Sequence, residues 1–174
     1  MYSKYTGVIL KKHPLGEADE LLTVFTRERG KMRFKSRSTR KIKSRLAGAL
    51  QTLNEIEFEI AGRGNLPLVI SVRISKLNNY LREDLRKFAI AQVGAETLYR
   101  ISPDGVTNGD AYEALQSFLD EKTGLRDFQL KLLQTHGYEN TKLTADKEQE
   151  IDRFLEYVLE RQIRSTDFMK FIET

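Results

Sequence analysis

The spacing of apolar residues changes near residue 76, and this change most constrains the fold of the chain. Before it, apolar and polar residues alternate with the period of two that is typical of β-strands. Five segments show the alternation, at residues 8–11, 22–25, 31–37, 53–60 and 68–75. Turns containing Gly16, Gly30 and Gly62 separate them. Five short antiparallel strands in this space predict a small closed barrel of the OB-fold type, with an SH3-like barrel as the alternative.

Alternation also predicts which side chains of each strand face the barrel interior. In the third strand, Met32 and Phe34 are expected to lie inward. The fifth strand offers a longer apolar set on its predicted inward face, with Ser71, Arg73 and Ser75 outward. That inward set is Leu68, Ile70, Val72 and Ile74.

From Leu77 onward the apolar residues recur with the 3.6-residue period of amphipathic helices. One long helix is predicted at residues 81–99, and a second at 111–119 with Asp110 as its N-cap and Gly124 closing it. A third at 128–133 stops at Gly137, a fourth covers 151–162, and a short fifth covers 167–172. The predicted fold class is α+β: an OB-fold barrel at residues 1–76 followed by an α-helical domain at residues 77–174.

The composition limits the chemistry that the chain can perform. It contains no cysteine, which excludes disulfides, thiolate zinc sites and a cysteine nucleophile. No apolar segment has the length of a signal peptide or membrane span, so we expect a cytoplasmic protein. The net charge of +4 hides two opposite halves, because residues 1–76 carry 16 Lys and Arg against 7 Asp and Glu.

Most of the positive charge lies between residues 27 and 45, where ten basic residues face the single acid Glu28. A solvated charge run is one interpretation of this segment. A nucleic-acid contact surface is the favoured one, because no interspersed acids neutralise the cations and each phosphate contact releases counterions. The predicted basic contact residues are Arg27, Arg29, Lys31, Arg33, Lys35, Arg37, Arg40, Lys41, Lys43 and Arg45.

The third strand carries the strongest part of this signal. Alternation turns its four cations, at positions 31, 33, 35 and 37, to one side of the strand. Residues two apart on a strand lie roughly 6.6 Å apart, so such a row can follow a nucleic-acid backbone. The OB-fold uses this region of its sheet to hold oligonucleotides.

Phe25 is the best aromatic candidate for stacking on a base, because it shares a strand face with Arg27 and Arg29. Core packing is an equally good interpretation of the same residue. With few other candidates, backbone contact is expected to dominate, which predicts weak sequence preference. Two alternatives stay open: an RNA-binding or ribosome-associated factor, and an interaction adaptor whose basic barrel binds acidic protein tails.

The residues for catalysis are sparse, and we expect no enzyme, cofactor or metal. His13 and His136 are the only histidines and cannot supply a zinc site without cysteine, so a surface or helix-end role is expected. Glu17, Asp19 and Glu20 form an acidic cluster. A magnesium-dependent nuclease could use Glu17 and Asp19, but salt bridges to nearby cations are the favoured interpretation.

Several segments resemble the RecO family of DNA recombination mediators. They are GVIL at residues 7–10, GEADELLTVFT at 16–26, GK at 30–31 and KSRLAGALQ at 43–51. The helical half resembles the family more weakly, at Phe128, Leu130, Leu133, Gly137, Tyr138, Arg153, Leu155, Tyr157, Leu159, Ser165 and Phe168.

The resemblance implies an OB-fold with a helical domain, binding of single- and double-stranded DNA, strand annealing, and loading of a recombinase. It also implies two partners, RecR and the acidic C-terminal tail of single-strand-binding protein, in a bacterial, nucleoid-associated setting. Arg126 and Lys131 are candidate contacts for that tail. Many family members carry a four-cysteine zinc module after the Gly-Tyr pair, whereas this chain has no cysteine there. The glycine common in the family's basic loop is also absent from residues 36–39.

Overall fold

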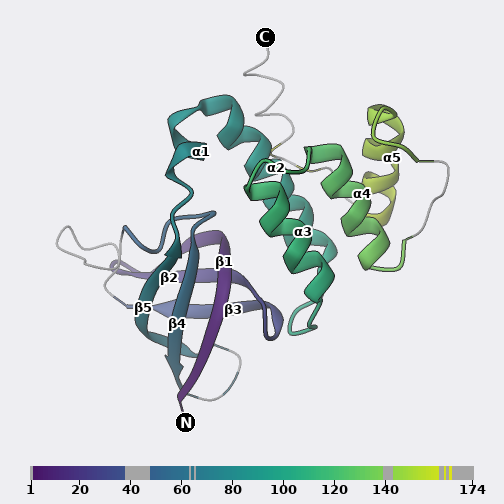
Figure 1. Ribbon diagram of the computed structural model, residues 1–174. Coiled ribbons are helices and arrows are strands. Elements are labelled where there is room, and N and C mark those ends of the chain that lie inside the picture. Colours follow the sequence, from purple (N-terminus) through teal and green to yellow (C-terminus); the bar gives the residue numbers. More distant parts are fainter. Residues whose placement is uncertain are drawn as a thin grey trace. The chain divides into compact units, whose positions relative to one another are not determined.

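The computed structural model describes residues 2–37, 48–62, 64, 66–138, 143–160, 163 and 165. The chain forms two compact units (Figure 1). The first comprises Met1–Asn78 together with the short segment Asp104–Thr107, and the second comprises Asn79–Pro103 and Asn108–Thr174. The segment Asp104–Thr107 thus belongs to the barrel unit, although it follows the first helices in sequence.

The first unit is a closed barrel of five strands in the order β1-β2-β3-β5-β4. Its strands are β1 (Tyr2–Leu15), β2 (Asp19–Thr26), β3 (Gly30–Ser36), β4 (Glu55–Ala61) and β5 (Leu68–Lys76). All neighbours are antiparallel except β3 and β5, which join in parallel at Lys35 and Leu68. This arrangement is the OB-fold, as predicted.

Aromatic side chains fill the barrel interior. Phe34 is fully buried, and its ring centroid lies 4.9 Å from that of Phe58 and 6.1 Å from that of Tyr5. Leu22 and Val24 of β2 belong to the same core. The alternation of the third strand therefore placed its inward residues correctly, because one face of the strand is apolar along its length.

The inward face predicted for the fifth strand is correct for Val72 but wrong for Ile70 and Ile74. Val69 is buried and Val72 packs against the core, whereas Ile70 and Ile74 are exposed. A register shift explains the facing of Val69 and Ile70: Ile60 of β4 pairs with Val69, whereas its neighbour Glu59 pairs with Ser71, so Ile70 is an extra residue. One inserted residue reverses the facing of a strand, because the side-chain period is two.

The second unit consists of helices. They are α1 (Asn79–Glu83), α2 (Leu85–Ile101), α3 (Gly109–Leu119), α4 (Leu125–Thr135) and α5 (Glu148–Leu159). The rings of Phe118 and Phe128 stack with centroids 4.5 Å apart and join α3 to α4. On α2, Gly94 leaves room for the Phe118 ring, because an added Cβ would lie 2.3 Å from it. Among the described residues, no helix is both long enough and apolar enough to span a membrane.

Two helix boundaries differ from the prediction because of capping. The long first helix is divided at Asp84, whose carboxylate accepts hydrogen bonds from the backbone N–H groups of Arg86 and Lys87. The cap of α3 is Asn108, whose side chain accepts from Ala111 N, and Asp110 lies in the first turn. Short polar side chains at both positions satisfy N–H groups that have no partner within a helix.

Two further predictions concern helix ends. Gly124 is the N-cap of α4 instead of the end of α3, which stops at Leu119. At the other end of α4, Gly137 has a φ of 83°. The predicted stop at Gly137 is confirmed, because that conformation suits glycine after a helix. The predicted helix at 167–172 lies outside the described residues.

His136 ends helix α4, as expected for a helix-end histidine. Its Nδ1 lies 2.8 Å from the carbonyl oxygen of Leu132, and its Nε2 lies 3.1 Å from the Ser102 hydroxyl. A carbonyl can only accept, so Nδ1 donates and Nε2 is left to accept from Ser102. Burial lowers the pKa of His136 below its ordinary value, although the Leu132 carbonyl acts in the opposite direction.

Candidate nucleic-acid interface

The outer face of β3 carries the row of cations. Met32 and Phe34 turn toward the core, so Lys31, Arg33 and Lys35 point outward. The Arg33 side chain is 57% exposed, whereas that of Lys31 is only 11% exposed. Arg37, just beyond the strand, is exposed. The row is therefore uneven: Lys31 is nearly buried, Lys35 is 32% exposed, and Arg33 and Arg37 are open to solvent.

Acids from elsewhere in the chain pair with three of these cations. Asp104 lies 3.2 Å from Lys31 Nζ and 3.3 Å from Arg33 Nη2, and Asp19 lies 3.0 Å from Lys35 Nζ. The acid-free stretch of sequence argued against full compensation of these cations. Lys31 and Arg33 are nevertheless paired, because the fold brings Asp104 across 71 positions to reach Arg33, whereas the pair of Lys35 with Asp19 is a local salt bridge that the sequence favoured.

The hairpin between β2 and β3 presents Arg27 and Arg29, which are both exposed. The turn is held firmly: Thr26 Oγ1 donates to the Gly30 carbonyl and accepts from Arg29 N. Both carboxylate oxygens of the intervening acid, Glu28, accept a bifurcated hydrogen bond from Thr6 N, at 3.0 and 3.1 Å. Its carboxylate is thus engaged with the barrel backbone beside the two arginines.

Phe25 is fully buried and therefore offers no surface for base stacking. It shares the outer strand face with Lys31, its cross-strand partner, but lies at the buried end of the row. Of the two interpretations drawn from sequence, packing is correct. Alternation predicts that Phe25 and the core residue Val24 point to opposite faces of β2. It cannot show that other residues also cover the outer face at Phe25.

Strand β1 adds two residues to this face that the sequence did not indicate. Lys11 pairs with Thr23, which pairs in turn with Arg33, and His13 pairs with Leu21, which pairs with Lys35. Both Lys11 and His13 are exposed. A register shift after Ile9 makes this possible, because Ile9 faces the core and Lys11, two residues later, faces out. Sequence alternation alone gives no signal for such a bulge.

The remaining predicted cations, Arg40, Lys41, Lys43 and Arg45, lie outside the described residues. The acidic cluster forms local ion pairs, as favoured from the sequence: Asp19 pairs with Lys35, and Glu20 lies 3.2 Å from Lys12. Within the described ranges, no group of three or more His, Asp or Glu side chains could hold a metal ion.

Residues 1–77 match the family described as "Recombination protein O N terminal". The chain is 30% identical over 144 residues to the DNA repair protein RecO of Anaeromyxobacter dehalogenans (strain 2CP-1), covering 78% of this chain and 57% of that protein. It is 31% identical over 143 residues to the DNA repair protein RecO of Dehalococcoides mccartyi (strain CBDB1), covering 78% and 56%. The chain belongs to the RecO family. It spans a little more than half the length of these curated relatives.

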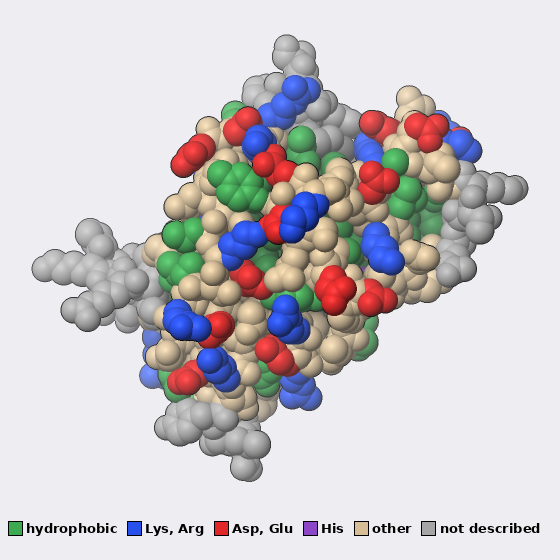
Figure 2. Space-filling view, in the orientation of Figure 1, with side chains coloured by type: hydrophobic (Ala, Val, Ile, Leu, Met, Phe, Trp, Pro, Cys, Tyr) green, Lys and Arg blue, Asp and Glu red, His purple; other side chains and the backbone are tan. Residues whose placement is uncertain are grey.

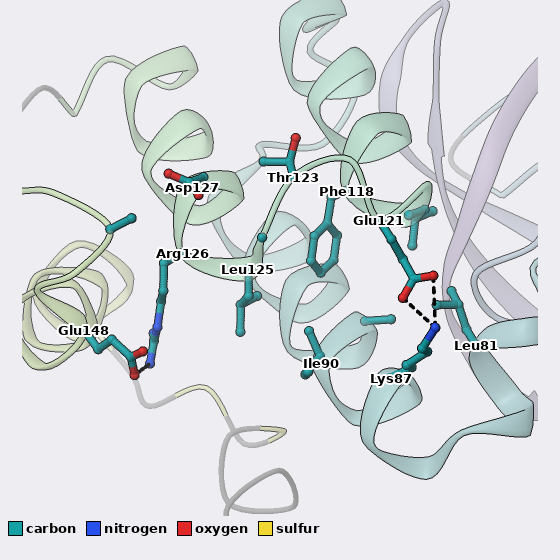
Figure 3. A pocket seen from close by; sticks show the side chains of 14 residues that line it. Leu81, Lys87, Ile90, Phe118, Glu121, Thr123, Leu125, Arg126, Asp127 and Glu148 are labelled. Carbon is teal, nitrogen blue, oxygen red and sulfur yellow. Dashed lines mark hydrogen bonds and ion pairs between the residues drawn. The ribbon is translucent and has the colours of Figure 1, made fainter.

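The two candidate tail contacts of this RecO-family chain line different grooves of the helical unit. Arg126 lines a groove of about 560 Å³ whose apolar wall includes Ile90, Phe118 and Leu125 (Figure 3). Lys131 is exposed and lines a second groove of about 500 Å³ between α3 and α4.

Arg126 is already engaged within the helical unit. Its side chain is only 15% exposed, and its guanidinium donates to Asp152, Glu148 and Gln129. Figure 3 shows it reaching toward Glu148, while at the other side of the groove Lys87 pairs with Glu121. Lys131 is the more accessible of the two predicted contacts, and its ammonium group donates a hydrogen bond to Gln134.

Proposed function

We propose that this RecO-family chain is a non-enzymatic DNA-binding protein of bacterial recombinational repair. The observation that supports it is the pair of outward cations Arg33 and Lys35 on strand β3 of an OB-fold barrel, followed by the exposed Arg37 just beyond the strand. The relatives reported above are both named as DNA repair proteins.

The chemistry of the row favours backbone contact over base reading. Lys and Arg bind phosphate through charge-assisted hydrogen bonds, which carry no sequence information. The buried Phe25 leaves base stacking to other side chains. We therefore expect binding of both single- and double-stranded DNA, weak sequence preference, and an affinity that falls steeply with salt.

A charge-reversal variant tests the proposal. The triple substitution R33E/K35E/R37E should weaken binding of a fluorescently labelled single strand by at least tenfold at 50 mM salt, as measured by anisotropy. The control reverses three exposed cations of the helical unit and keeps the same net charge change. Its substitutions are R86E, K122E and R153E. Equal affinity of the two triple variants, or wild-type affinity that ignores salt, would contradict the proposal.

Matched DNA and RNA strands separate this proposal from RNA binding. An unlabelled RNA of the same sequence should compete for the labelled DNA no better than unlabelled DNA does. Clear preference for RNA would favour the alternative of an RNA-binding factor.

We further propose that the chain promotes strand annealing and recombinase loading together with RecR and single-strand-binding protein. Lys131 is proposed to contact the acidic tail of the latter, because it is exposed and positively charged. Annealing of complementary strands coated with single-strand-binding protein should be faster with the chain present. K131E should lower the affinity for a tail peptide and leave binding of naked DNA unchanged.

A further inference from the structure

The segment Asp104–Thr107 is attached to the edge of the cation row. Gly105 N donates to the Lys31 carbonyl at 2.8 Å, and Thr107 Oγ1 donates to the Glu28 carbonyl at 3.0 Å. Lys31 and Asp104 also form a parallel β-bridge. These contacts fix the position of the segment without using the Asp104 carboxylate.

Gly30 allows the segment to lie directly on the strand. Its φ is 64°, and a Cβ at this position would lie 1.9 Å from the carbonyl oxygen of Val106. Only glycine fits both the backbone angle and the approach. The main chain beside Asp104 is thus held close to the start of β3.

The Asp104 carboxylate joins two cations through its two oxygens. Oδ1 lies 3.2 Å from Lys31 Nζ, and Oδ2 lies 3.3 Å from Arg33 Nη2. The two halves of this arrangement differ in exposure. The Lys31 side chain is 11% exposed, whereas those of Arg33 and Asp104 are 57% and 54% exposed. The pair with Lys31 is therefore largely enclosed, and the pair with Arg33 is open to an ion from solvent.

We propose that the Asp104 carboxylate occupies the position of one backbone phosphate and competes with DNA for Arg33. This inference rests on the proposed function and deepens it, since it names a residue that sets the affinity of the same site. A carboxylate oxygen and a phosphate oxygen offer the same kind of acceptor to a guanidinium. DNA that reaches Arg33 must displace Asp104 Oδ2, while Lys31 keeps its partner at Oδ1.

The competition has a measurable signature in salt dependence. In the wild type, the Asp104 carboxylate already neutralises Arg33. A phosphate that replaces this carboxylate therefore releases few additional counterions. Without the carboxylate, Arg33 contributes a full phosphate contact, and the slope of log K against log salt should steepen by about 0.7 for a single strand. An exposed ion pair contributes about 0.2–1 kcal/mol. Removing this one should therefore tighten binding by about 1.4- to fivefold.

The test compares D104N with E57Q, a charge-matched control. Asp104 and Asn have nearly the same shape, and the backbone bonds of the segment do not involve the carboxylate. Glu57 lies on β4, which does not neighbour β3, and its carboxylate likewise pairs with two cations, Lys4 and Arg73, whose side chains are exposed. Affinities for a labelled oligothymidine are measured by anisotropy from 50 to 200 mM salt. Circular dichroism checks that each variant is folded, and D104S serves if D104N is not.

The expected result is tighter binding and a steeper slope for D104N, with E57Q close to the wild type. In the R33Q background, D104N should have a much smaller effect, because the contested cation is gone. If D104N and E57Q behave alike, or if D104N weakens binding, the competition is overturned while the proposed function stands. If the wild type shows no salt-dependent DNA binding, the proposed function itself fails.

Discussion

Lys31 and Arg37 are both cations of one predicted row, yet their surroundings predict opposite consequences of neutralising them. Lys31 is nearly buried and pairs with Asp104, whereas Arg37 is exposed beyond the end of β3. We expect K31Q to affect mainly stability and R37Q to affect mainly DNA binding. Each substitution removes one positive charge, so net charge cannot explain a difference between them.

The magnitudes follow from the two environments. Exposed ion pairs contribute about 0.2–1 kcal/mol, whereas removing one partner of a fully buried pair costs about 3–5 kcal/mol. The Lys31–Asp104 pair lies between these limits, since one side chain is 11% and the other 54% exposed. K31Q should therefore lower the free energy of unfolding by about 1–2 kcal/mol. R37Q should change it by less than about 0.5 kcal/mol.

Two measurements check this pair of predictions. Urea denaturation followed by circular dichroism gives the change in the free energy of unfolding. Anisotropy titrations of a labelled single strand, at several salt concentrations, give the slope of log K against log salt. R37Q should make that slope shallower by about 0.7, and K31Q should leave it unchanged. A loss of slope in K31Q equal to that in R37Q would refute the reasoning from burial.

Three further predictions concern the folded framework. G30A should lower the free energy of unfolding by about 2 kcal/mol or more, since its Cβ would lie 1.9 Å from the Val106 carbonyl oxygen. The control G16A has a similar φ but open space around the Cβ, and it should lower the free energy of unfolding by only about 1 kcal/mol. Equal losses in the two variants would argue against the clash. D84A removes the cap of α2 and should cost about 0.5–2 kcal/mol in urea denaturation, whereas D84N should recover most of the loss. Because burial lowers the pKa of His136 in the folded state, the unfolded chain binds its proton first, so stability should fall as pH drops below about 6.5. Unfolding curves at pH 7.5 and 5.5 should show a smaller pH effect for H136N than for the wild type, and an undiminished effect would contradict the assignment.

The barrel could be predicted from the sequence because strand alternation is a local property. Phe34 and Met32 fall on the inner face of β3 because every second residue there is apolar. Local patterns could not reveal the inserted residue Ile70 in β5 or the shift after Ile9 in β1. Both bulges depend on how neighbouring strands pair, and each reverses the facing of the residues that follow.

The candidate site shows the same division more sharply. The sequence identified the cations and their common strand face, because both the charges and the alternation are properties of the local sequence at residues 31–37. It could not identify Phe25 as covered, Lys11 as part of the same face, or Arg126 as enclosed by acids. Exposure depends on what packs over a side chain, and those residues come from distant positions in the chain.

The sequence by itself therefore determined the OB-fold strands, the helices that follow, and the presence of an outward basic row. Only the tertiary structure decided how much of that positive charge meets solvent. Asp104 is 71 positions from Arg33 in sequence, yet its carboxylate lies 3.3 Å from the guanidinium. Electrostatic interactions depend on separation in space, and the fold alone sets that separation.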